Sequence, residues 1–88
     1  MKGIESTICE FLLQLPTARK IRKLKPGDSL FRRGLLDSQG VINMVAFCEE
    51  TFDIEILDKD VLPENFESVR ALTRLIKRAQ SRLTRPAG

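Results

Sequence analysis

Apolar residues recur at intervals of three and four along three stretches of the chain, the spacing of one face of an α-helix. The first stretch covers residues 3–15 and ends before Pro16, because proline does not continue a helix. The second runs from Ser38 to Phe52, and the third begins after Ser68. The pattern predicts three long helices that bury their apolar faces against one another.

Each predicted helix has a stripe of residues that we expect in the core. In the first helix the stripe is Ile4, Ile8, Phe11, Leu12 and Leu15. In the second it is Val41, Val45, Cys48 and Phe52, with Met44 beside them. In the third it is Val69, Leu72, Leu75, Ile76 and Ala79. Asp37 and Ser68 precede the second and third helices and are suitable N-cap residues.

The remaining segments are predicted to be connections. Residues 16–37 contain two Pro and two Gly and predict a long loop pinned to the core by its leucines. Residues 52–56 alternate like a strand, but the chain offers no second strand, so we expect an extended loop. Residues 63–66 have room for a single helical turn. The predicted fold is all-α: a small irregular four-helix bundle, three helices long and one short, with a long loop between the first and second helices.

The length of 88 residues indicates one domain, which we place at residues 1–82, followed by a flexible basic tail at residues 83–88. No stretch approaches the roughly 20 apolar residues of a membrane span. The N-terminus also lacks the order of charged and apolar residues found in a signal peptide. We therefore expect a cytoplasmic monomer without a membrane span.

Composition argues against several classes of active site. The chain has no His, so a Ser or Cys nucleophile would lack its usual general base, and we expect neither catalytic residues nor a metal site. Cys9 and Cys48 lie far apart in helical patterns without redox or zinc spacing, so they are expected to be buried, reduced thiols. The chain is therefore not expected to be an enzyme.

The net charge of +3 conceals a strong segregation of charge. Residues 16–36 carry a net +6 and residues 69–88 another +6, whereas residues 37–68 carry −8. Basic clusters can bind nucleic acid, but such sites usually add aromatic stacking or a recognition motif, and the chain has no Trp or Tyr. The basic segments favour a solvated face, a protein-docking face or pairing with the acidic middle over a nucleic-acid site.

The junction before the second helix holds the best candidate for a functional residue. An Asp-Ser pair in this place is ordinarily only a helix cap. Here, however, it closes the segment Gly-Leu-Leu-Asp-Ser at residues 34–38. Glu-Glu-Thr-Phe-Asp-Ile-Glu-Ile follows at residues 49–56, and Phe-Glu-Ser-Val at residues 66–69.

These three segments, in this order and at these intervals, resemble the free-standing members of the acyl, peptidyl and D-alanyl carrier protein superfamily. The resemblance covers about residues 28–76 and a first helix of suitable length. It implies that a phosphopantetheinyl transferase attaches a 4′-phosphopantetheine arm from coenzyme A to Ser38, with Asp37 as the cap beside it. It also implies that cargo is carried as a thioester, loaded by a ligase or synthase and passed to a downstream transferase.

The resemblance also implies a partner-binding face on the second helix, at Gln39, Gly40, Ile42, Asn43, Ala46, Glu49 and Glu50. Fatty-acid carriers have Leu at the place of Gln39 and acids at the places of Gly40 and Asn43. They are also strongly acidic, whereas this chain has a pI near 9.2. These departures imply a dedicated partner rather than a general one.

Two alternatives stay open at this point. The cargo of the carrier is either an acyl chain, as in fatty-acid-like or polyketide-like synthesis, or an amino acid, as in specialised aminoacyl carriers. The other hypothesis is a small interaction module that is never modified and binds protein or nucleic acid through its basic faces. The module predicts that binding weakens steeply with salt and does not depend on Ser38.

Overall fold

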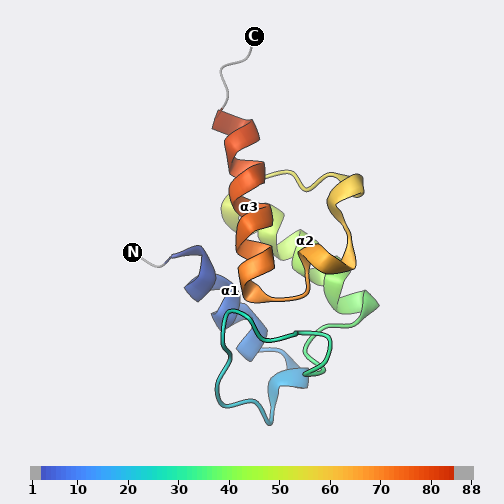
Figure 1. Ribbon diagram of the computed structural model, residues 1–88. Helices are drawn as coiled ribbons and strands as arrows, with labels where there is room; N and C mark the ends of the chain where they lie inside the picture. Colours follow the sequence, from blue (N-terminus) through green and yellow to red (C-terminus); the bar gives the residue numbers. More distant parts are fainter. Residues whose placement is uncertain (1–2, 85–88) are drawn as a thin grey trace.

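The computed structural model describes residues 3–84, which form three α-helices and no strand (Figure 1). The helices are α1 (Ile4–Leu13), α2 (Ser38–Phe52) and α3 (Val69–Thr84). Three short 3-10 turns lie at Pro16–Ala18, Asp58–Asp60 and Pro63–Asn65. The prediction of an all-α fold with three main helices is confirmed for this part of the chain.

α3 is the central helix, and both α1 and α2 pack against it. All five residues of its predicted stripe are buried. In α2 the most deeply buried side chains are Met44 and Cys48, while Val41 and Val45 are only partly buried. The predicted stripe of α2 was therefore partly wrong: Met44, expected beside the stripe, is fully buried together with Cys48, whereas Val41 and Val45 lie at the edge of the core.

α1 ends earlier than predicted, at Leu13, with Gln14 as its C-cap. Leu15 then adopts an extended conformation with φ −69° and ψ 146°, because the ring of Pro16 disfavours a helical residue before it. Phe11 stacks on Phe47 of α2 with ring centroids 4.0 Å apart. This contact packs the C-terminal end of α1 against α2. The first two helices thereby form a partly buried aromatic contact outside the α3 interface.

The segment between α1 and α2 is irregular but bonded to the rest of the molecule. The Leu30 N–H donates to the carbonyl of Glu67 at 2.7 Å, and the Arg70 N–H donates to the carbonyl of Pro26 at 2.9 Å. Gly34 has φ +74°, a left-handed conformation that glycine adopts without strain. The buried side chains of Leu30 and Leu35 complete the attachment.

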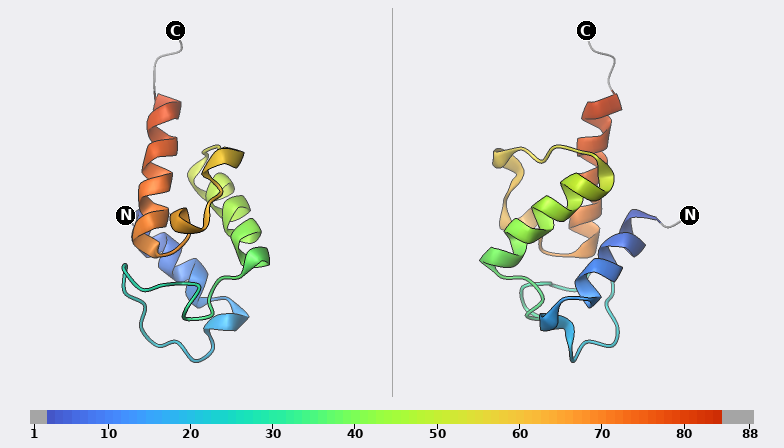
Figure 2. Two further views of the ribbon diagram at one scale, coloured as in Figure 1. Left: turned by 45° about the vertical axis from the view of Figure 1, so that its right-hand side comes forward. Right: turned by 180° about the vertical axis from the view of Figure 1, so that it is seen from behind.

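Residues 53–68 leave the end of α2, run back alongside this helix and reach the start of α3 (Figure 2). Ile54 and Ile56 are buried and make no strand, as expected for an extended segment. The fourth, short helix predicted at residues 63–66 is not confirmed, because Pro63–Asn65 is a single 3-10 turn. The buried Phe66 and the cap at Ser68, whose Oγ accepts from the Ala71 N–H at 3.1 Å, leave no room for a longer helix.

Two further predictions concern the C-terminal tail and the absence of a membrane span. Leu83 and Thr84 belong to α3, and the rest of the predicted flexible tail, residues 85–88, lies outside the described residues. Within residues 3–84, no helix is both long and apolar enough to cross a membrane.

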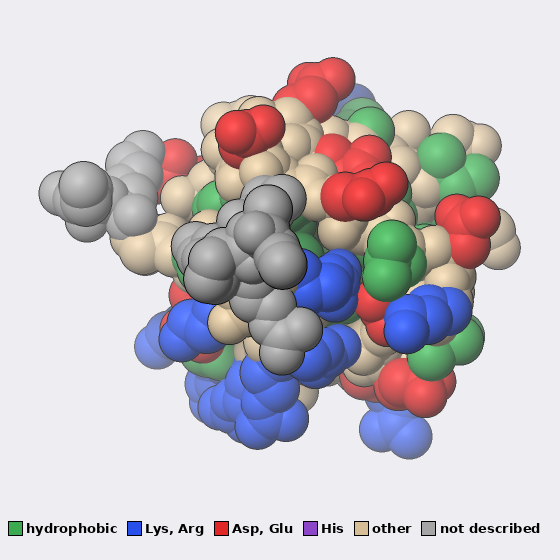
Figure 3. Space-filling model, turned by 90° about the horizontal axis from the view of Figure 1, so that it is seen from above, with side chains coloured by type: hydrophobic (Ala, Val, Ile, Leu, Met, Phe, Trp, Pro, Cys, Tyr) green, Lys and Arg blue, Asp and Glu red, His purple; other side chains and the backbone are tan. Residues whose placement is uncertain are grey.

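Charge is segregated in space as well as along the chain. Seen from the C-terminal end of α3, Lys and Arg side chains gather on one side of the molecule, and Asp and Glu lie mostly on the other (Figure 3). The acidic side chains come chiefly from the last turn of α2 and from residues 53–67. The described molecule therefore has a pronounced charge asymmetry.

Candidate functional site

Asp37 and Ser38 form the N-terminal junction of α2. Asp37 is extended, with φ −132°, and its Oδ1 accepts a hydrogen bond from the Gly40 N–H at 2.7 Å. Its carbonyl accepts from the Val41 N–H at 2.9 Å, which is the first hydrogen bond of the helix. Ser38 is thus the first helical residue, and its side chain is exposed. Asp37 acts as the predicted cap.

The backbone at this junction is a suitable place for an anion. The N–H groups of Ser38 and Gln39 precede the first helical hydrogen bond, so they have no acceptor within α2. The positive end of the helix dipole lies at the same point. A phosphate joined to the Ser38 Oγ would therefore lie close to two N–H donors and a favourable dipole.

Gly40 allows the cap to approach the helix closely. A Cβ at this position would lie 3.1 Å from Leu36 Cδ2 and 3.3 Å from Asp37 Oδ1. A larger side chain would therefore press on the cap and on a buried leucine. A substitution of Gly40 would therefore require Leu36 or Asp37 to shift by a few tenths of an ångström.

An open groove of about 610 Å³ lies beside Ser38. Its lining is Phe31, Asp37, Ser38, Val41, Ile42, Val61, Leu62 and Pro63, and is mostly apolar. Ile42 is 61% exposed and Leu62 41% exposed, so two large aliphatic side chains of the same lining face solvent. The groove joins the start of α2 to the turn region of residues 61–63.

Of the seven residues predicted to face a partner, Gly40 is partly buried and Asn43 is exposed, and the other five fall into two groups. Gln39, Ile42, Ala46 and Glu50 are exposed at intervals of three and four on α2, so they share one face. Glu49 is only partly exposed, and its Oε2 accepts a hydrogen bond from the Ile56 N–H at 2.9 Å. Glu49 therefore holds the segment after α2 in place and is less available to a partner than the other four.

The far wall of the groove was missed by sequence reasoning. Val61 and Leu62 lie within an acidic stretch without helical periodicity, so no pattern connected them with Ser38. The sequence signal that could have identified them is a pair of aliphatic residues directly before Pro63. This connection contains no predicted helix or strand that could bury both side chains. Their proximity to Ser38 comes from the return of residues 53–68 along α2.

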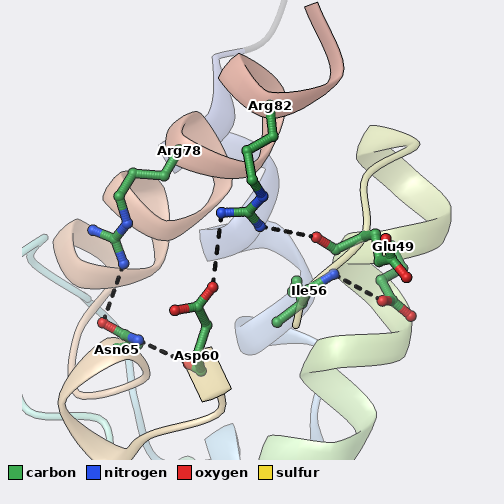
Figure 4. A network of polar contacts seen from close by, with 7 residues as sticks. Glu49, Ile56, Asp60, Asn65, Arg78 and Arg82 are labelled. Atoms are coloured by element: carbon green, nitrogen blue, oxygen red, sulfur yellow. Dashed lines mark hydrogen bonds and ion pairs between the residues drawn. The ribbon is translucent and has the colours of Figure 1, made fainter. Parts of the chain in front are cut away.

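A polar network holds this wall against α3 (Figure 4). Asn65 donates from Nδ2 to the carbonyl of Asp60 at 2.8 Å and accepts from Arg78 at 3.4 Å. Arg82 donates to the carbonyl of Glu55 at 3.2 Å and lies 3.7 Å from the Asp60 carboxylate. Arg82 thus contacts Asp60, before Val61 and Leu62, and Arg78 contacts Asn65, after them. The two arginines therefore hold this turn region against α3.

Both cysteines are free thiols with little tendency to ionise. Burial, with a smaller contribution from the neighbouring Glu49 charge, raises the pKa of Cys48 from 9.0 to about 12. Cys9 is half-buried, and burial followed by the charge of Glu5 raises its pKa as well. Neither thiol has the lowered pKa of a reactive cysteine.

No family model matches this chain, and comparison with curated proteins gives no match. The functional assignment therefore depends on the site itself. Its main features are an exposed serine at the first position of a capped helix, an anion-compatible backbone and an adjoining apolar groove.

Proposed function

We propose that this chain is a small carrier protein that holds an acyl or aminoacyl group on a 4′-phosphopantetheine arm attached to Ser38. The observation that carries the proposal is the exposure of Ser38 at the start of α2, beside an open and mostly apolar groove. The arm, when attached, supplies a terminal thiol that holds cargo as a thioester. The resemblance of residues 34–38, 49–56 and 66–69 to carrier proteins supports the same conclusion.

The chain's own residues suit the role of a substrate for modification. In the transfer, the Ser38 Oγ forms a new bond to phosphorus, coenzyme A releases its adenosine bisphosphate part, and the hydroxyl proton passes to a base. The chain has no His to act as that base, so the transferase has to supply it. Ser38 therefore needs exposure and position rather than internal activation.

The groove gives the cargo-bearing arm an apolar surface to contact. Phe31, Val41 and Leu62 line it, and an aliphatic chain or the arm itself would bury apolar area there. An aminoacyl group would use the same arm with less burial. The proposal therefore covers both cargo classes.

The carrier proposal also gives roles to the connecting segments and names the expected partners. The 3-10 turns of residues 58–65 would stand in place of the short fourth helix of a carrier bundle, with residues 14–37 as its long first loop. The expected partners are a phosphopantetheinyl transferase, a loading ligase or synthase and a downstream transferase. The chain is proposed to act as a cytoplasmic monomer.

Transfer of a fluorescent coenzyme A analogue tests the proposal. The native chain, Ser38→Ala and Ser6→Ala are incubated with several promiscuous phosphopantetheinyl transferases and separated on a denaturing gel. Ser6 is also an exposed serine in the first half of a helix, so its variant controls for serine loss as such. We expect label on the native chain and on Ser6→Ala, and none on Ser38→Ala. Absence of label on the native chain with every transferase would favour the unmodified interaction module.

A further inference from the structure

Two segments far apart in the sequence expose an unusual number of basic side chains. One is the loop of residues 19–33 and the other is residues 70–77 of α3. The exposed basic residues of these segments, here called the basic surface, are Arg19, Lys20, Arg22, Lys23, Lys25, Arg32, Arg33, Arg70, Arg74 and Lys77. The inference concerns what this surface binds, and it holds whether or not Ser38 is modified.

The two segments meet, so the basic side chains belong to one surface. The Pro26 carbonyl accepts from the Arg70 N–H, and a Cβ on Gly27 would lie 3.4 Å from the Arg70 guanidinium. Arg33 donates to the carbonyl of Lys23 at 2.9 Å, which brings the two arms of the loop together. The charge therefore continues from the loop onto α3.

Almost none of this charge is neutralised within the described residues. Arg33 pairs with Asp28 at 2.7 Å, and no ion pair within residues 3–84 involves the other nine basic side chains. Asp28 is held as an anion, because hydrogen bonds from the Lys25 N–H and the Arg33 side chain lower its pKa. By contrast, Arg78 and Arg82, further along α3, contact the acidic segment. Within residues 3–84, Arg78 and Arg82 thus serve the fold, whereas Arg33 alone of the basic surface forms an ion pair.

The position of this charge does not stabilise α3. Arg70 is the second residue of the helix, and the first turn contains no acid. A cation at this end opposes the helix dipole, which favours negative charge there. The charge of Arg70 therefore does not stabilise the helix through its dipole, and exposed charge at this end is available for binding.

The composition of the surface distinguishes between classes of partner. Ile21 and Leu24 of the loop pack against the core, so they are not available for insertion into a membrane. None of the five Phe residues is exposed within residues 3–84, and the chain has no Trp or Tyr for base stacking. What remains outward is a set of guanidinium and ammonium groups on segments whose backbones are hydrogen-bonded to one another. Such a set matches carboxylate groups on another protein by charge complementarity.

We infer that the basic surface is a docking site for a carboxylate-rich surface of a partner protein. The loop and the start of α2 lie at the same end of the molecule (Figure 1). A partner seated on the basic surface would therefore be close to Ser38. Such a partner would also be distinct from proteins that bind acidic carriers through basic patches.

The test compares matched charge reversals in binding to a defined probe. A fluorescein-labelled peptide rich in Glu and Gly is titrated with the full chain at about 0.15 M ionic strength, where only close charges interact. Lys25→Glu changes the loop and Arg74→Glu changes α3. Lys59→Glu makes the same change in net charge on the acidic side, where Lys59 is exposed. We expect each of the first two variants to weaken binding by about threefold to tenfold and Lys59→Glu to leave it nearly unchanged.

Several results would overturn the inference. One is that the peptide does not bind the native chain, and another is that all three reversals weaken binding equally, since binding would then report net charge alone. A third is tighter binding of single-stranded RNA of equal charge, or of vesicles with anionic lipid, with the same dependence on Lys25 and Arg74. Circular dichroism of each variant shows whether the fold is retained, and the two variants lie on different elements, so damage to one does not remove the test.

Discussion

At the scale of single residues, the account depends on the few atoms around Asp37 and Ser38. Sequence reasoning predicted the cap at Asp37, because N-cap chemistry is local and needs no knowledge of the rest of the fold. Ser38 was singled out by the resemblance of residues 34–38 to carrier proteins, and its exposure was learned from the structure. Sequence reasoning did not predict the close approach of Gly40 to Leu36, which depends on how the loop enters the helix. Local chemistry was therefore predictable here, whereas local sterics were not.

Substitution of Asp37 separates the cap from the charge. Asp37→Ala removes the oxygen that accepts from the Gly40 N–H and should lower the free energy of unfolding by about 1 kcal/mol. Asp37→Asn keeps an oxygen in the same place and should cost only a few tenths of that amount. Urea unfolding monitored by circular dichroism measures both. Equal destabilisation by Ala and Asn would show that the cap hydrogen bond is not what matters.

The cysteines give a prediction about thiol reactivity. With a pKa of about 12, Cys48 is a thiolate in only about one molecule in ten thousand at pH 8, and the thiolate is the form that reacts. Iodoacetamide at pH 8 should therefore leave Cys48 of the native chain unmodified, while the same reagent in urea should label both cysteines. Peptide mass spectrometry measures the two sites separately. Labelling of native Cys48 at the rate seen in urea would contradict the burial.

The same raised pKa predicts how stability depends on pH. The Cys48 thiol ionises near pH 9 in the unfolded chain and near pH 12 in the folded one. Its contribution to stability is therefore fully present below pH 9 and is lost as the pH rises from 9 towards 12. Comparison of the native chain with Cys48→Ala over this range isolates that loss.

At the scale of elements, the helices were predictable and their contacts were not. Hydrophobic periodicity gave the bounds of α2 and the full core stripe of α3, because both depend on spacing along one segment. Two features were not predicted: the full burial of Met44 in α2 and the 3-10 turn in place of a short helix at residues 63–66. The burial of Met44 depends on packing between segments, and the 3-10 turn at Pro63–Asn65 is followed directly by the buried Phe66 and the cap at Ser68.

The attachment of the groove wall to α3 is an element-scale feature that can be tested. Arg78→Ala and Arg82→Ala each remove a contact between α3 and the turn region, and should lower the free energy of unfolding by about 1 kcal/mol or less. They should also speed hydrogen exchange at the amides of Asn65 and Phe66, which close the 3-10 turn. Arg74→Ala, on the same helix but outside these contacts, serves as the control. Equal exchange in all three variants would show that the arginines do not hold the wall.

At the scale of the whole molecule, the segregation of charge was visible in the sequence, but its meaning was not. Counting charges showed two basic segments and one acidic segment. Only the folded chain shows that the two basic segments meet at Pro26 and Arg70, and that Arg78 and Arg82 turn instead to the acidic segment. Long-range contacts of this kind have no signature in local spacing. The groove beside Ser38 was unpredictable for the same reason.

The most direct test of the central claim locates the modification within the native chain. The chain is incubated with coenzyme A and a promiscuous phosphopantetheinyl transferase, its intact mass is measured, and it is then digested with trypsin. Since no Lys or Arg lies between Arg33 and Lys59, trypsin is expected to release residues 34–59 as one peptide, in which Ser38 is the only serine. The account predicts one added phosphopantetheine group per chain, all of it on Ser38 of this peptide. An unmodified chain with every transferase tried, or the added group on any other residue, would contradict it.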